Sequence, residues 1–400
     1  MDIDLARQLS VPGDTKLLLF VMDGLGGLPH PESGRTELES ARTPNLDSLA
    51  RESACGFTLP VAPGVTPGSG PGHLSLFGYD PLKFNIGRGA LEAVGIDFDL
   101  RPQDVAARGN FCTVDGKGRV TDRRAGRITS ERCGELCEEL RKIPLEGAEL
   151  FVEPVREHRF VFVLRGDGLS DAVADTDPQR EGTEPLPPRA TAPEGEATAR
   201  LVARFVDEAQ RVLAAKTPAN TLLLRGFARR PDWPSMSDVF KLTPAAVAHY
   251  PMYRGLAKLV GMEALPAGPG LDDSIATVRE NRDQFDYFFM HYKYTDTAGE
   301  DGDFERKVAK IEEVDAAIPS LLALKPDVLM VAGDHSTPAV LAAHSWHPVP
   351  FMMRAPWTRT DACDAFNEVA LQTGSLGTFP AVEALPLALA HAGRLTKYGA

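Results

Sequence analysis

The sequence contains little cysteine, fewer basic than acidic residues, and no long hydrophobic run. Five cysteines scattered over 400 residues argue against a disulfide framework and favour a reducing compartment. The net charge of −13 excludes a general electrostatic attraction to nucleic acid or anionic membranes. The apolar runs are too short to span a bilayer, and residues 1–15 lack the apolar segment of a signal peptide. We therefore expect a cytosolic protein that binds neither nucleic acid nor membrane.

Three short apolar runs are each followed by an acid. Their continuous hydrophobicity predicts strands that are buried on both faces of a sheet. The runs are residues 16–22, 285–291 and 328–332. The acids that follow them are Asp23, Asp296 and Asp334, the last with His335 beside it.

Hydrophobic residues recur at helical spacing between these runs, as in residues 201–213 and 304–318. Strands that alternate with helices predict an α/β fold with a doubly wound, mostly parallel sheet. Ligands bind such sheets outside the carboxyl ends of the strands. We therefore expect the three acids and His335 to converge there.

The middle of the chain has a different pattern. Short alternating segments at residues 108–114 and 159–164 favour a small sheet of its own, and the Pro-rich residues 177–195 predict a long loop or hinge. We predict a smaller α+β domain at residues 101–200, inserted into a domain formed by residues 1–100 and 201–400.

The candidate metal ligands are carboxylates and imidazoles. They are Asp23, Asp296, Glu300, Asp334, His335 and His344, with His347 as a competing imidazole. Oxygen-rich ligation with one or two imidazoles suits Mn²⁺, Mg²⁺ or Zn²⁺, and two such ions form a standard clamp for phosphoryl transfer. Each acid alone could equally be a solvated loop carboxylate.

Two further features allow a functional and a structural interpretation. Ser69 lies in the Gly/Pro loop at residues 66–73 and is either a nucleophile activated by metal or part of a plain Gly/Ser turn. Cys133 and Cys137 lie one helical turn apart, but no second ligand pair follows, so we expect buried thiols rather than a metal site.

Arginines cluster in the middle region of this acidic chain. Arginine binds carboxylate and phosphate in a bidentate manner, so the cluster predicts a clamp for a small acidic substrate; surface ion pairs or helix caps are the other interpretation. The candidates are Arg123, Arg124, Arg127, His158 and Arg159.

These motifs together resemble the alkaline phosphatase superfamily and, within it, the archaeal-type class of cofactor-independent phosphoglycerate mutases. They cover most of the chain in the expected order. The matching stretches are LFVMDGLGG (19–27), RTPNLDSLA (42–50), TPGSGPGHLSLFGYDP (66–81), GRGALEAVG (87–95), DRRAGRI (122–128), TDTAGEDGDF (295–304), GDHSTP (333–338) and HSWHPVP (344–350).

The resemblance implies two divalent ions, drawn from Mn²⁺, Mg²⁺, Co²⁺ and Zn²⁺. It assigns one ion to Asp23, Ser69, Asp334 and His335, and the other to Asp296, Glu300 and His344 rather than His347. Glu300 departs from the family pattern D-x-x-G-H, which leaves metal preference open; the second site then either binds its ion less tightly or recruits Asp301 instead. Arg254 is a further candidate for binding substrate.

The implied reaction converts 3-phosphoglycerate into 2-phosphoglycerate through phosphorylated Ser69, without 2,3-bisphosphoglycerate. Closure of the inserted domain would exclude water from the intermediate. A metal-dependent phosphatase or another phosphomutase is the first rival. A catalytically inactive sensor is the second, and a sulfatase is disfavoured because His73 stands where its motif has arginine. The oligomeric state is left open.

Overall fold

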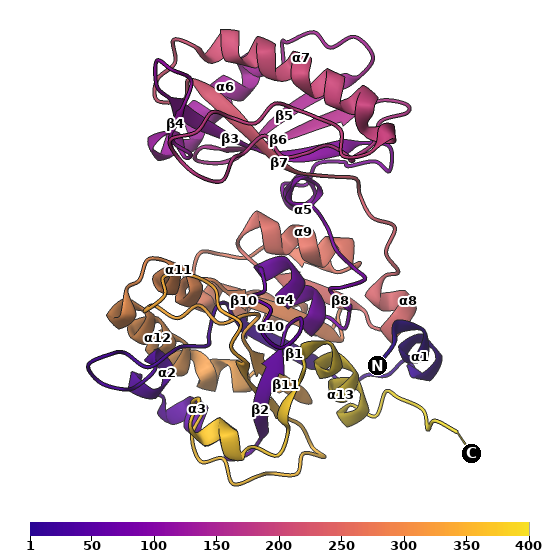
Figure 1. Cartoon of the computed structure of the whole chain (residues 1–400). Helices are drawn as coiled ribbons and strands as arrows, with labels where there is room; N and C mark the ends of the chain where they lie inside the picture. The colour runs from indigo at the N-terminus through magenta and orange to yellow at the C-terminus, as the bar shows by residue number, and fades with distance from the viewer. Residues whose placement is uncertain (400) are drawn as a thin grey trace. The chain divides into compact units, whose positions relative to one another are not determined.

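The computed structural model describes residues 1–399 and divides into two compact units. Unit 2 is Ile86–Asp232, and unit 1 comprises the chain before and after it (Figure 1). The predicted insertion at 101–200 was too narrow at both ends. The chain on either side belongs to unit 2 because α5 (Arg88–Gly95) packs on its sheet and β7 (Thr221–Ala228) pairs with a central strand of that sheet.

Unit 1 contains an eight-stranded sheet in the order β13-β2-β12-β11-β1-β10-β8-β9. Only β12 runs antiparallel to its neighbours, which confirms the predicted mostly parallel sheet. The strands are β1 (Leu17–Met22), β2 (Ala54–Leu59), β8 (Pro244–Val247), β9 (Glu263–Leu265), β10 (Tyr287–Tyr292), β11 (Val328–Ala332), β12 (Val349–Arg354) and β13 (Gly377–Pro380).

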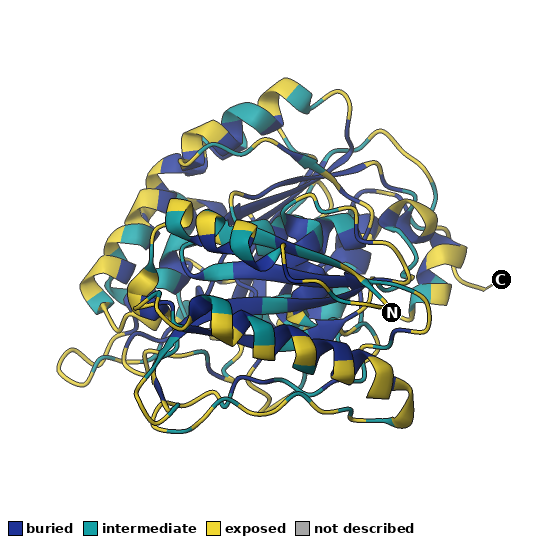
Figure 2. Cartoon of the chain, turned by 90° about the horizontal axis from the view of Figure 1, so that it is seen from above, coloured by how far each residue is buried: buried dark blue, intermediate teal, exposed yellow. Residues whose placement is uncertain are grey.

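The three predicted apolar runs form β1, β10 and β11, which lie side by side at the centre of the sheet. Every residue of these strands is buried, as expected where helices cover both faces. Figure 2 shows strands of the chain largely in dark blue, among helices whose residues alternate between exposed and buried.

Helices of unit 1 connect the strands. These helices are α1 (Ile3–Leu9), α2 (Glu37–Ser40), α3 (Pro44–Ala50), α4 (Ser69–Leu76), α8 (Met236–Phe240), α9 (Pro251–Leu259), α10 (Leu271–Asn281), α11 (Tyr294–Glu300), α12 (Phe304–Leu322) and α13 (Ala384–His391). The helical pattern predicted at residues 304–318 lies within α12.

Unit 2 is an antiparallel sheet in which β3 lies between β6 and β7. Helices α6 and α7 pack on one face and α5 on the other, giving the predicted α+β unit. Besides α5 and β7, its elements are β3 (Val105–Val114), β4 (Val120–Asp122), α6 (Ser130–Leu140), β5 (Glu149–Arg156), β6 (Arg159–Arg165) and α7 (Glu196–Leu213).

The Pro-rich stretch is a loop, but it does not join the units. Residues 177–195 lie wholly within unit 2, where the Gly182 N–H donates to the Val120 carbonyl (2.8 Å). The chain instead enters unit 2 after Asn85 and leaves it after Asp232. The two ends of unit 2 lie close together, because a Cβ on Gly87 would lie 2.8 Å from the Ala228 Cβ.

The cysteines agree with a further expectation. All five thiols are free and buried, and Cys133 and Cys137 pack in the core of unit 2. Over residues 1–399, no helix combines the length and hydropathy that a membrane span requires.

Candidate active site

The carboxyl ends of β1, β10 and β11 bring the predicted acids together. Asp23 directly follows β1, Asp296 lies in the short helix after β10, and Asp334 follows β11. All three side chains are fully buried, as is His335. Gly24 is required beside them because its φ of +65° is left-handed, and a Cβ there would lie 2.7 Å from Asp296 Oδ1.

One set of ligand atoms surrounds the His335 ring. Its Nε2 lies 3.1 Å from Ser69 Oγ, 3.3 Å from Asp23 Oδ1 and 3.2 Å from Asp334 Oδ2. Within the described chain, these two buried carboxylate oxygens accept no hydrogen bond. Buried oxygens without partners are costly, so this arrangement has the chemistry of a cation site.

The tautomer of His335 is fixed by its other nitrogen. The Thr337 hydroxyl donates to Asp296 Oδ1 (2.6 Å), so its oxygen is left to accept from His335 Nδ1–H (2.9 Å). Nε2 then carries the lone pair that faces Asp23 and Asp334. Burial also lowers the pKa of His335 despite those carboxylates, which favours the neutral imidazole that metals bind.

A second set of ligand atoms lies beside the first. His344 Nε2 is 3.7 Å from Asp296 Oδ1 and 3.6 Å from Glu300 Oε1, and its ring stacks on that of His335. Burial works to lower the pKa of His344, but the neighbouring Glu300 carboxylate raises it to about 9. His347 instead lies against Trp346 and Ser345.

Lys293 and His291 contact the outer oxygens of the carboxylates. His291 Nε2–H donates to Asp23 Oδ2 (2.8 Å), and Lys293 Nζ lies 3.3 Å from the same atom and 2.5 Å from Asp296 Oδ2. Burial tends to raise the pKa of Asp23, but Lys293 and His291 hold it well below its usual value. Burial and the charge of Asp23 raise the pKa of Asp296.

Ser69 is the first residue of α4, at the half-buried end of that helix. His73 Nδ1–H, one turn later, donates to the Ser69 carbonyl (2.8 Å) and lies 3.1 Å from Asp334 Oδ2. The helix approaches the strand ends closely, because a Cβ on Gly72 would lie 2.2 Å from the Asp334 carbonyl oxygen. The N-terminus of a helix favours a negative charge, which suits a phosphorylated Ser69.

Four residues of this cluster were not predicted: His73, His291, Lys293 and Thr337. Lys293 follows β10 directly, so the rule that identified Asp23 at a strand end could have found it. His291 lies inside an apolar strand, where one imidazole gives no pattern of its own.

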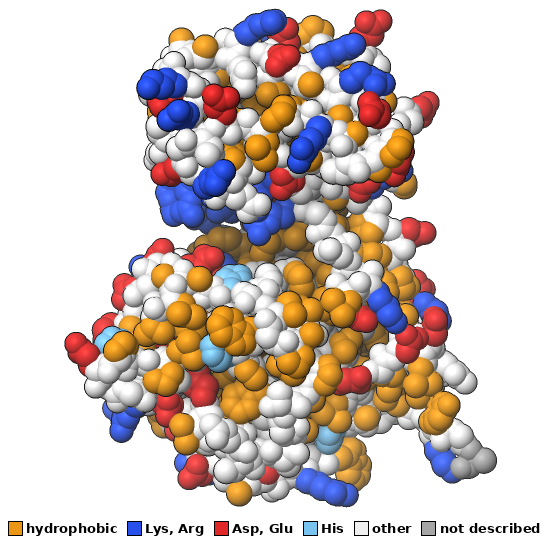
Figure 3. Space-filling model, viewed as in Figure 1, with side chains coloured by type: hydrophobic (Ala, Val, Ile, Leu, Met, Phe, Trp, Pro, Cys, Tyr) orange, Lys and Arg blue, Asp and Glu red, His pale blue; other side chains and the backbone are white. Residues whose placement is uncertain are grey.

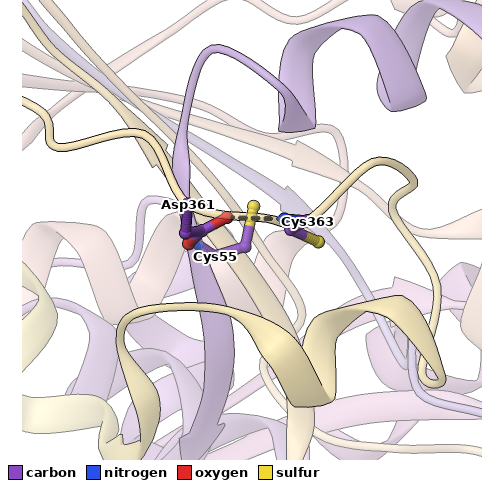
Figure 4. A group of neighbouring side chains, drawn as sticks. All are labelled: Cys55, Asp361 and Cys363. Atoms are coloured by element: carbon purple, nitrogen blue, oxygen red, sulfur yellow. Dashed lines mark hydrogen bonds between the residues drawn. The ribbon is translucent and has the colours of Figure 1, made fainter.

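A third group of metal-type side chains lies elsewhere in unit 1 and has a structural explanation. Cys55, Asp361 and Cys363 place sulfur and oxygen atoms within 4.8 Å of one another (Figure 4). The Asp361 carboxylate, however, accepts backbone N–H groups of Cys55 (2.9 Å), Cys363 (3.0 Å) and Ser375 (2.7 Å). Asp361 therefore anchors a loop to β2.

The predicted substrate clamp is spread over both units. In unit 2, Arg123 forms a bidentate ion pair with Asp177, which occupies its guanidinium, while Arg124 and Arg127 are exposed. Arg254 lies in unit 1, on α9.

Unit 2 also places together arginines that were not predicted. Arg108 on β3 lies opposite Arg225 on β7 and 3.1 Å from the Glu92 carboxylate. Burial and the charge of Arg108 lower the pKa of Arg159, so these guanidiniums share one positive region. Figure 3 shows Lys and Arg side chains gathered along one edge of this unit. Such a region fits a small anion.

His158 gives unit 2 a distinct pH dependence. It is only 3% exposed, and burial together with Arg159 and Arg108 lowers its pKa to about 4 from an ordinary 6.5. In the unfolded chain His158 is protonated as the pH falls below 6.5, whereas in the folded chain it stays neutral until the pH falls to about 4. Its contribution to stability is therefore complete above 6.5 and is lost as the pH falls to 4.

We expect His158→Gln to remove this dependence. Between pH 6.5 and 4, the free energy of unfolding of the original protein should fall by up to about 3 kcal/mol more than that of the variant. Urea unfolding at several pH values measures this difference. His249→Gln, at an exposed position, is the control, and parallel curves for His158→Gln and the original protein would refute the prediction.

Comparisons with known proteins agree with one another. The family model of 2,3-bisphosphoglycerate-independent phosphoglycerate mutase matches residues 50–220. A "Probable 2,3-bisphosphoglycerate-independent phosphoglycerate mutase" from Thermus thermophilus is 52% identical over 399 residues, covering 98% of each chain. One from Thermotoga maritima is 50% identical and covers 96% of each chain.

Two solved structures are similar along nearly their whole length. The cofactor-independent phosphoglycerate mutase of Thermoplasma acidophilum has a TM-score of 0.71 at 30% identity and covers 95% of this chain and 100% of its own. The PH0037 protein of Pyrococcus horikoshii has a TM-score of 0.84 at 29% identity, with 96% and 99% covered.

Proposed function

The chain belongs to the family of 2,3-bisphosphoglycerate-independent phosphoglycerate mutases, and we propose that it interconverts 3-phosphoglycerate and 2-phosphoglycerate through phosphorylated Ser69. The observation that carries this proposal is the convergence of Ser69 Oγ with two buried carboxylate oxygens that accept no hydrogen bond, Asp23 Oδ1 and Asp334 Oδ2, around His335 Nε2. A serine needs activation to attack phosphorus, and a divalent ion held by this set of neighbours would supply it without a dedicated base.

The proposed metal ligands follow the two sets of atoms described above. Asp23, Ser69, Asp334 and His335 would hold one divalent ion, and Asp296, Glu300 and His344 the other. Bound there, Mn²⁺, Mg²⁺, Co²⁺ or Zn²⁺ would supply positive charge that favours ionised Ser69 and offsets the charge of the phosphoryl oxygens.

The proposed reaction consists of two successive phosphoryl transfers. In the first, the Ser69 Oγ–P bond forms, the bond from phosphorus to O3 of 3-phosphoglycerate breaks, and O3 takes up the proton that Ser69 gives up. The N-terminus of α4 then faces the dianionic phosphoserine. In the second half, the bond from O2 of the retained glycerate to phosphorus forms, the Ser69 Oγ–P bond breaks, and Ser69 takes up the proton that O2 gives up.

The arginines of unit 2 are proposed to bind the anionic ends of the substrate. Arg124, Arg127 and Arg159 are the predicted candidates, and Arg108 and Arg225 join them. Arg123 contributes less, because Asp177 already occupies its guanidinium. His158 contributes as a neutral imidazole, since its pKa is about 4. Arg254 is the candidate from unit 1.

A cytosolic location stays a prediction.

The proposed function is tested by turnover of 3-phosphoglycerate after chelation and addition of Mn²⁺ or Mg²⁺, without 2,3-bisphosphoglycerate. We expect 2-phosphoglycerate to form in a metal-dependent manner with little free phosphate. Release of phosphate without the isomer would identify a phosphatase with the same site. No reaction with either metal would contradict an enzyme acting on this substrate.

A further inference from the structure

Lys293 lies between the two proposed metal sites without occupying either. Its Nζ pairs with Asp23 Oδ2 and with Asp296 Oδ2, and its side chain is 15% exposed. The opposite oxygens of these carboxylates are the ones that face His335 and His344. Lys293 therefore contacts an acid of each set while leaving the inner ligand atoms free.

We propose that Lys293 supplies the excess positive charge of the metal-loaded site and thereby sets its affinity for the phosphoryl group. This inference rests on the proposed function. Two divalent ions balance the four carboxylates of Asp23, Asp296, Asp334 and Glu300, while His335 and His344 are neutral as ligands. As long as Ser69 keeps its proton, Lys293 then leaves this set of groups with one positive charge for a phosphorylated, anionic substrate.

Glu300 contributes a negative charge to the same site to which Lys293 contributes a positive one. It is 54% exposed and contributes the one carboxylate of the set that is not deeply buried. Histidine can also bind a divalent ion, so Glu300→His removes a negative charge while keeping a ligand at that position. The pair Lys293 and Glu300 can therefore be changed in opposite directions.

The charge of Lys293 is not replaced by another cation in contact with these acids. In residues 1–399, the ion pairs of Asp23 and Asp296 are with Lys293 and with histidines alone. Removing Lys293 therefore changes the net charge of the site itself. Because burial keeps water from screening these atoms, one charge has a large effect on a neighbouring anion.

The test measures binding of inorganic phosphate to the Mn²⁺-loaded full-length protein by calorimetry, with Mn²⁺ binding measured in parallel. For Lys293→Met we expect phosphate affinity to fall at least about tenfold, while Mn²⁺ affinity is unchanged or higher because a nearby positive charge is gone. Glu300→His should raise phosphate affinity. The double variant should return it to within about threefold of the original.

Lys310→Met is the matched control, because each of the two lysines lies over a tyrosine ring, Lys293 over Tyr253 and Lys310 over Tyr294, but Lys310 pairs with Glu313, which is not a proposed ligand. It should leave both affinities unchanged. Unchanged phosphate affinity in Lys293→Met would overturn the inference. Loss of Mn²⁺ binding in that variant, or no recovery in the double variant, would overturn it in favour of a merely structural role. The proposed function fails separately, through absent mutase turnover of the original protein.

Discussion

Replacement of Ser69 by alanine is expected to reduce mutase turnover by at least about 10,000-fold, because it removes the hydroxyl that lies beside His335 Nε2 and the proposed metal ligands. The expectation concerns the described residues, in which Ser69 Oγ is the hydroxyl that lies 3.1 Å from Nε2. Folding should be little affected, since the half-buried Oγ makes one hydrogen bond, to His335 Nε2, and the bond from His73 to the Ser69 carbonyl stays in place. Turnover and thermal unfolding of the same preparation measure the two effects.

Ser75→Ala provides the matched control on the same helix. Ser75 Oγ donates to the Pro60 carbonyl (2.7 Å), so this variant should lose about 1 kcal/mol of stability but keep its turnover. Intact mass after incubation with 3-phosphoglycerate adds a direct readout: one phosphoryl group on the original chain and none on Ser69→Ala. Appreciable residual turnover in Ser69→Ala would remove Ser69 from the role of nucleophile.

Replacement of His335 by alanine is expected to reduce turnover by more than about 100-fold, the loss that even outer partners of metal ligands commonly produce. Its Nε2 is the nitrogen of the first set, so metal content should fall from two ions per chain towards one. His344→Ala should give a similar loss at the second set. Metal analysis of the purified variants checks both results.

His347→Ala is the control for these variants, because its imidazole lies against Trp346 and Ser345 rather than against the acids. It should keep both ions and nearly full turnover. A greater loss of metal in His347→Ala than in His344→Ala would contradict the assignment of ligands in this segment.

The convergence of the acids could be predicted from sequence because it follows from topology. A parallel sheet brings the ends of its strands to one edge, so Asp23, Asp296 and Asp334 meet wherever their runs form neighbouring strands. Side-chain pairing has no such rule. Asp177 lies far along the chain from Arg123, and their ion pair depends on how a loop returns to the sheet of unit 2.

The boundaries of unit 2 could not be predicted from local sequence patterns either. The spacing at residues 201–213 predicted a helix, which forms part of α7, but this spacing does not say in which core the helix packs. Strand β7 belongs to unit 2 because it pairs with β3, more than one hundred residues earlier. Pairing over such a separation leaves no trace in either segment alone.

The two segments that join unit 2 to unit 1 lie next to each other at Gly87 and Ala228, and this has an evolutionary consequence. An insertion whose ends meet can be exchanged for another, or lost, as if it were one surface loop, without altering the order of strands in the host sheet. The residues proposed to perform the chemistry and most of those proposed to recognise the substrate are therefore free to diverge separately. New substrates can arise by replacement of one module while the catalytic apparatus is inherited intact.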